Sequence, residues 1–299
     1  MPTQRSCRLL LHLSLPLALF ALPVLAAEPA FPHETGIYEG WLKMYDLQFA
    51  AAHQVFAQWQ RDHPTDPLGP ASDAAAYLFS ELARLGSLEA ELFVDDSRFI
   101  SRSKLQPDPA MKTRFDTEID EANRLADADL QKSDRDANAL FVKSLVCGLR
   151  ADYAGLIDKR DLAALIYTNQ GRPYAEKLLA VDPTAFDAHL GPGVENYLLS
   201  FKTAPLRFVL RLTGSKVDRA AGVQHLEAAS LHGYYLEPFA KLLLAVVALR
   251  NNDPERASEL LGGLHDRFPD NQLFVRELNR IHVPPSSTDA ATPEAAVSK

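Results

Sequence analysis

The sequence predicts an all-α fold in which helical hairpins stack side by side. Apolar residues recur at helical spacing along nearly the whole chain, and strand-like alternation never extends beyond a few residues. Short polar breaks separate the helical segments, and short connections make successive helices antiparallel neighbours. With 47% apolar and 23% charged residues, the composition is that of a foldable chain and excludes collagen-like and globally disordered classes.

The first element is a secretory signal peptide, predicted for residues 1–26. Arg5 and Arg8 form a short basic front, an apolar run covers residues 9–25, and small residues precede a cleavage site after Ala26. The alternative is an uncleaved anchor, which two prolines and the shortness of the run disfavour. We therefore expect an exported protein of the periplasm or cell envelope.

The next elements are amphipathic helices in a domain at residues 34–282, which a linker at residues 27–33 precedes. The clearest periodic segments lie at 49–59, 78–85, 140–149, 162–166 and 242–249. In the first of them, the apolar residues that share one helical face are Phe49, Ala52, Val55, Phe56 and Trp59. None of these hairpins can bury its apolar face alone, so the units must stack into one continuous core.

Small residues recur at a fixed distance before several helix ends. Ala52, Phe56 and Pro64 show a small residue, a large apolar residue four places on, and a terminating proline; the second such set is Ala257, Leu261 and Pro269. This pattern resembles the tetratricopeptide repeat, a helix-turn-helix unit of about 34 residues. Gly40 matches the small residue of the first helix of a unit.

The resemblance covers most of residues 34–282 and extends to secreted bacterial tetratricopeptide proteins of unassigned function. Two further units are degenerate, because Asp134 and Gly233 stand where the family has its proline. The resemblance implies a helical-hairpin solenoid with degenerate repeats, in which the first helix of each hairpin lines a concave groove.

Three stretches depart from the hairpin pattern. Residues 101–112 contain two prolines and are predicted to form a loop between helical blocks. Residues 197–213 are strongly apolar with three basic residues, and are either an amphipathic element that docks on a membrane or partner, or a helix that fills the protein's own groove. Residues 283–299 are predicted to be a disordered tail.

The motifs of common enzyme and metal sites are not recognisable. His225 and His232 have the wrong spacing for a zinc-binding helix, and no phosphate-binding glycine loop or nucleophile turn occurs. The acidic balance, with a formal net charge of −8, argues against a nucleic-acid partner. We therefore expect no enzyme activity, no catalytic residues, no metal and no cofactor.

Aromatic and amide side chains on the first helices are the candidate binding residues. They can hold an extended peptide, the aromatic rings through contact area and the amides through its backbone. The set that the resemblance indicates is Tyr38, Trp41, Tyr45, Tyr77, Asn138, Asn196, Tyr197, Tyr234, Tyr235 and Lys241. The leading hypothesis is an exported scaffold that binds a protein or peptide partner through its concave face. The alternative is a peripheral envelope component attached to the membrane through residues 197–213.

Overall fold

The computed structural model describes residue 31 and residues 33–86, 106–199 and 218–282. The predicted signal peptide, the tail 283–299 and the insert beyond Leu199 lie outside these ranges. Within the described ranges 82% of the residues are helical and none is in a strand, which confirms the all-α prediction.

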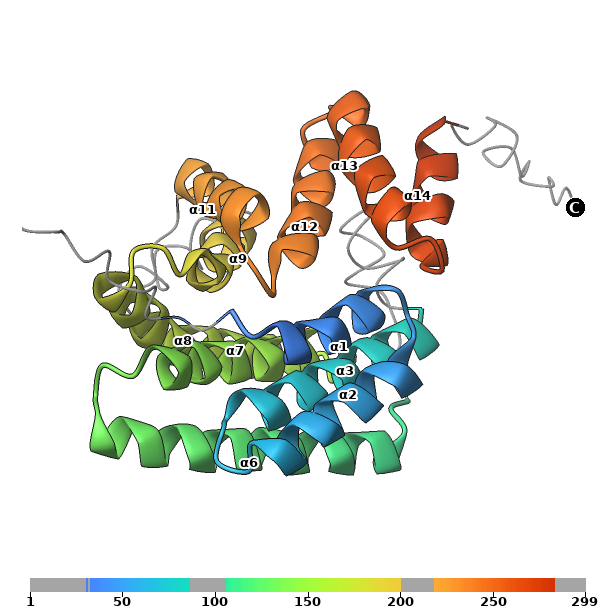
Figure 1. Ribbon diagram of the computed structural model, residues 1–299. Helices are drawn as coiled ribbons and strands as arrows, with labels where there is room; N and C mark the ends of the chain where they lie inside the picture. Colours follow the sequence, from blue (N-terminus) through green and yellow to red (C-terminus); the bar gives the residue numbers. More distant parts are fainter. Residues whose placement is uncertain (1–30, 32, 87–105, 200–217, 283–299) are drawn as a thin grey trace, which may run out of the picture.

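The helices of the described ranges fall into two groups (Figure 1). The N-terminal group contains α1 (Thr35–Tyr45), α2 (Phe49–Asp62), α3 (Leu68–Arg84), α6 (Pro109–Lys132), α7 (Ala137–Asp152) and α8 (Asp161–Val181), with a π-helical turn η1 (Tyr153–Ile157) after α7. The C-terminal group contains α9 (Leu190–Leu199), α11 (Arg219–His232), α12 (Glu237–Arg250), α13 (Pro254–Arg267) and α14 (Gln272–His282), and a 3₁₀ turn η2 (Phe186–His189) leads into it.

Aspartate side chains begin several of these helices. Asp136 accepts a hydrogen bond from the backbone N–H of Ala139 at 2.8 Å, and Asp108 accepts one from Ala110 at 2.8 Å. Because Asp108 caps α6 and Pro109 occupies its first position, the predicted loop at 101–112 is wrong for its last residues. A proline at the start of a helix leaves no internal hydrogen bond unmade, so it begins α6 here rather than breaking it.

Each helix packs on the next one along the chain within both groups, and α3 also packs on α1 and on α7. The α1–α2 contact is the closest of the glycine-mediated ones, since a Cβ atom on Gly40 would lie 2.3 Å from Cε1 of Phe56. Ala52 of α2 is fully buried, as is Ala257 of α13. Gly40 therefore lies where α1 and α2 approach closely, and both alanines lie in the core.

The two ends of the domain meet. Asn271, at the start of α14, donates through its side-chain amide to the carbonyl of Tyr45 at 2.8 Å, and the backbone N–H of Asp270 donates to Asp46 at 2.9 Å. Phe31, from the predicted linker, is only 1% exposed and belongs to the main core. The N-terminal segment and α1 therefore contact the C-terminal group as well as their own.

Candidate functional site at the junction of the helical groups

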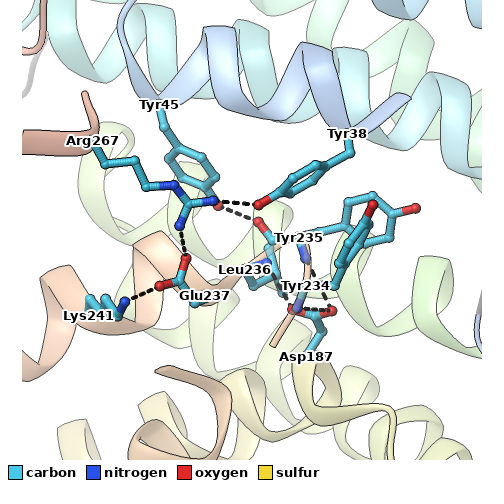
Figure 2. Close-up of polar contacts among 9 residues, drawn as sticks. All are labelled: Tyr38, Tyr45, Asp187, Tyr234, Tyr235, Leu236, Glu237, Lys241 and Arg267. Atoms are coloured by element: carbon cyan, nitrogen blue, oxygen red, sulfur yellow. Dashed lines mark hydrogen bonds and ion pairs between the residues drawn. The ribbon is translucent and has the colours of Figure 1, made fainter. Parts of the chain in front are cut away.

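The turn between α11 and α12 is held by one buried carboxylate. Asp187 of η2 accepts hydrogen bonds from the backbone N–H groups of Tyr234 at 3.0 Å, Tyr235 at 3.2 Å and Leu236 at 2.8 Å (Figure 2). Burial raises the pKa of Asp187 above its ordinary value, although the three N–H donors act in the opposite direction. A Cβ atom on Gly233 would lie 2.9 Å from Asp187, so this turn has no room for a side chain there.

This fixed turn places Tyr235 in the core between the helical groups. Its ring is fully buried, and Tyr45 of α1 donates its hydroxyl to the Tyr235 carbonyl at 2.9 Å. The Tyr235 hydroxyl accepts the backbone N–H of Glu34 at 3.0 Å. Burial raises the pKa values of both tyrosines, so neither hydroxyl ionises near neutral pH. We call this cluster of Tyr38, Tyr45, Tyr234, Tyr235, Asp187, Glu237 and Arg267 the tyrosine junction.

At the outer part of the tyrosine junction, the half-buried rings of Tyr38 and Tyr234 stack with the exposed ring of His33. Tyr234 lies between His33 and Tyr38, with ring centroids 4.3 Å away on each side and interplanar angles of 15° and 25°. Arg267 of α13 donates to the Tyr38 hydroxyl at 2.5 Å and to Glu237 at 2.5 Å. Stacking and hydrogen bonding therefore fix the positions of these rings before any ligand arrives.

Two cationic side chains border this stack. Lys241 pairs with Glu237 one turn earlier in α12, and Arg267 pairs with the same carboxylate from α13. Their side chains are 37% and 39% exposed, whereas that of Glu237 is 11% exposed. The one carboxylate is largely covered and both cations reach solvent, so we define the exposed rim of the junction as Tyr38, Tyr234, Lys241 and Arg267.

The structure brings six of the ten predicted binding residues together at or beside the junction. Tyr38, Tyr234 and Lys241 are half-buried, whereas Trp41, Tyr45 and Tyr235 are buried. Trp41 packs 5.8 Å from the Tyr235 ring and donates its indole N–H to Ser72 at 3.0 Å. These three buried side chains join the helical groups, so they are not available to an approaching partner in this conformation.

The other four predicted residues lie away from the junction. Asn196 and Tyr197 are buried in α9, and the Asn196 amide donates to the carbonyl of Pro192. Asn138 of α7 donates to Asp66 at 2.8 Å, and Tyr77 of α3 packs 4.1 Å from the His53 ring. Each of them therefore has contacts outside the junction, and none contributes to the rim.

The binding residues predicted from the sequence do not include Asp187, Glu237 and Arg267. A Gly-Tyr-Tyr sequence between two helices indicates a turn, and the backbone N–H groups of a buried turn need a hydrogen-bond acceptor. The need for an acceptor could therefore be predicted from the sequence. The identity of the acceptor was not readable, since Asp187 precedes Tyr234 by 47 positions. Arg267 meets Tyr38 across 229 positions, and no local pattern signals such a contact.

A second polar cluster lies where α2, α3 and α6 meet. The His53 ring nitrogen Nδ1 lies 2.5 Å from Asp73, and Gln60 donates to Glu118 at 3.2 Å. Burial, and then the nearby charge of Asp73, raise the pKa of Glu118 to about 7. His53 is thus a paired, partly buried side chain rather than an isolated ligand.

Ligand-type side chains of metal sites do not converge in threes anywhere in the described ranges. Among the helices placed by the structure, none combines the length and apolar character needed to cross a bilayer. No protein-family model matches the chain, and no curated protein matches its sequence. The tetratricopeptide resemblance accordingly rests on the repeat motifs alone.

Proposed function

We propose that the chain is an exported helical-repeat protein of the tetratricopeptide kind, resident in the periplasm or cell envelope. It acts as a non-catalytic scaffold, and a protein or peptide partner binds at the exposed rim of the tyrosine junction. The repeat motifs support the architecture, because Gly40 and Phe56 make the close helix contact that a hairpin requires. The basic front and apolar run of residues 1–26 support export.

The exposed rim is the observation that carries the proposal. Tyrosine and arginine are the residue types over-represented where interfaces contribute most binding energy, because they combine large area with hydrogen-bonding groups. Tyr38, Tyr234 and Arg267 already hold one another in place through stacking and a hydrogen bond. A partner that docks here therefore orders few side chains, which lowers the entropic cost of binding.

The rim also favours a particular partner chemistry. Lys241 and Arg267 are both partly exposed and share one largely covered carboxylate, so each cation can also reach an anionic group of a partner. An aspartate, a glutamate or a terminal carboxylate of the partner can pair with the guanidinium of Arg267. The aromatic rings beside it supply apolar area for the partner's neighbouring side chains.

A comparison of matched arginine variants tests the proposal. The mature chain serves as bait in an envelope extract, and the retained proteins are compared for wild type, Arg267→Gln and Arg124→Gln. Arg124 is an exposed arginine of α6 that pairs with Glu121 three residues earlier, so it controls for the loss of one surface ion pair. We expect Arg267→Gln to lose a partner that Arg124→Gln retains, with both variants folded.

A second pair of variants tests binding at the rim without changing Arg267. Lys241→Gln changes the rim, and Lys132→Gln changes an exposed lysine that pairs with Asp129 in α6. A partner that is retained equally by all four variants would contradict binding at the rim. Binding of the intact chain to anionic liposomes would instead favour attachment through residues 197–213.

A further inference from the structure

The short segment before α1 lies against distant parts of the chain in the manner of a bound peptide. Phe31 is 1% exposed, and its ring packs edge-on against Phe141 of α7, with centroids 4.7 Å apart, and against Tyr235 at 5.8 Å. His33 stacks on Tyr234. The described residues of this segment are not helical, so their backbone N–H groups do not donate within a helix of their own.

Side chains from elsewhere bind this backbone. The N–H of Phe31 donates to Asp182 at 3.0 Å, and the N–H of Glu34 donates to the Tyr235 hydroxyl at 3.0 Å. These partners are 151 and 201 positions away along the chain. An all-helical surface offers no free strand edge, so an extended peptide must be held by side chains in this way.

Asp182 is built to accept such a hydrogen bond. The residue is 6% exposed, and its second carboxylate oxygen accepts both the N–H of Thr184 at 2.8 Å and the Thr184 hydroxyl at 2.6 Å. Burial raises the pKa of Asp182, but the hydrogen bonds from Thr184 and Phe31 outweigh burial, and the net pKa is lowered. The carboxylate is therefore ionised and ordered, with one oxygen directed at the segment.

We propose that Phe31, His33 and Glu34 form an intrachain ligand that occupies a peptide-binding site made by Phe141, Asp182 and Tyr235. The ligand class of this site is an extended segment with an aromatic side chain, whose backbone N–H groups donate to Asp182 and to the Tyr235 hydroxyl. A partner segment of this chemistry displaces the chain's own segment. The inference rests on the proposed function, because His33 of the segment stacks on Tyr234 of the rim.

Competition by the tethered segment regulates the site. A segment attached by a short connection competes as if present at about millimolar concentration, so an outside ligand binds with reduced apparent affinity. Weakening the tethered segment raises that affinity. The aromatic ring is the group to remove, because burial of a phenylalanine side chain changes a binding constant by about tenfold or more.

A peptide supplied in trans tests the proposal on the mature chain, residues 27–299. The probe is a fluorescent peptide of residues 27–36, and its binding is measured by anisotropy to wild type, Phe31→Ala and Phe115→Ala. Phe115 is a buried phenylalanine that stacks on Tyr153, so its removal controls for the loss of a core ring elsewhere. We expect Phe31→Ala to bind the peptide at least about tenfold more tightly than the other two proteins. A peptide with alanine in place of Phe31 should not bind, and folded Phe31→Ala that binds neither peptide would overturn the proposal.

Hydrogen exchange on the wild-type chain keeps the proposal testable if Phe31→Ala does not fold. A displaceable segment must open without global unfolding, so the amides of Phe31 and Glu34 should exchange faster than the hydrogen-bonded amides of α7. Equal protection of both would show that the segment is ordinary core and would overturn the inference. A partner that depends on Arg267 but binds wild type and Phe31→Ala equally would leave the scaffold standing and remove only the intrachain ligand.

Discussion

Replacing Gly40 by alanine should destabilise the protein, although alanine is the better helix former. A Cβ atom at this position would lie 2.3 Å from Cε1 and 2.8 Å from Cδ1 and Cζ of Phe56. Carbon atoms in contact prefer about 3.5–4.0 Å, so the ring or a whole helix must move by about 1 Å or more. Phe56 is fully buried in a close-packed core, which leaves its ring no open space to enter.

Two opposing terms set the magnitude. Helix propensity favours alanine over glycine by about 1 kcal/mol, whereas overpacking a core costs about 1–3 kcal/mol. Because the clash is with a ring rather than a flexible chain end, we expect the second term to exceed the first. The free energy of unfolding should fall by up to about 2 kcal/mol, which lowers the melting temperature by up to about 8 °C in a domain of this size.

Urea denaturation of matched glycine variants is the assay. Gly148 of α7 and Gly262 of α13 have nothing within 4 Å of an added Cβ, so Gly148→Ala and Gly262→Ala should each stabilise by about 0.5–1 kcal/mol. Adding Phe56→Leu to Gly40→Ala should recover part of the loss, since the smaller side chain relieves the clash. If Gly40→Ala is as stable as the two controls, α1 and α2 do not pack as described and the hairpin reasoning is refuted.

Three further predictions concern the junction, the second polar cluster and the last hairpin. Asp187→Ala leaves the N–H groups of the turn without their acceptor, so the free energy of unfolding should fall by about 3–5 kcal/mol. The control Asp218→Ala removes an exposed helix cap and should cost about 1 kcal/mol. Urea denaturation measures both, and equal losses of stability would contradict the role of Asp187 in the turn. Burial and the charge of Asp73 raise the pKa of Glu118 to about 7, so this carboxyl group stays protonated to a higher pH in the folded protein than in the unfolded chain. The stability that this shift contributes is fully present below pH 4.5 and is lost as the pH rises through 7. Glu118→Gln should therefore gain about 1–2 kcal/mol relative to wild type between pH 5 and pH 8, after allowance for partial exposure, and a pH-independent difference would refute this. Ala257→Leu should overpack the contact of α12 with α13 and cost about 1–3 kcal/mol, and an unchanged denaturation midpoint would show that this hairpin is misplaced.

Local signals in the sequence predicted the helices well. The apolar face of residues 49–59 became α2, and Ala52 and Phe56 on it are fully buried. Helix periodicity depends on neighbours three and four positions away, so it is readable without tertiary information. The start of α6 was equally local, because Asp108 followed by Pro109 is a helix-start signal, and only its reading as a loop was wrong.

Long-range closure of the domain was not predictable in the same way. Tyr45 and Tyr235 appeared in the sequence as groove residues, yet they are buried because the turn after α11 packs against α1. A repeat pattern specifies how each hairpin meets the next one and contains no information about contacts between the first and last helices. The rim could therefore not be predicted from the sequence, because it depends on the contact between Arg267 and Tyr38.

Site-specific photo-cross-linking tests most directly whether a partner contacts the tyrosine junction. A photoreactive phenylalanine analogue replaces Tyr234 in one protein and Tyr167 in another, and both are exposed to envelope extract and irradiated. Tyr167 is a half-buried tyrosine of α8 with Arg150 over its ring, so it offers a similar environment away from the rim. We predict a covalent adduct with a partner protein at position 234 and none at position 167. A partner that still co-purifies but cross-links only at position 167 would contradict the account.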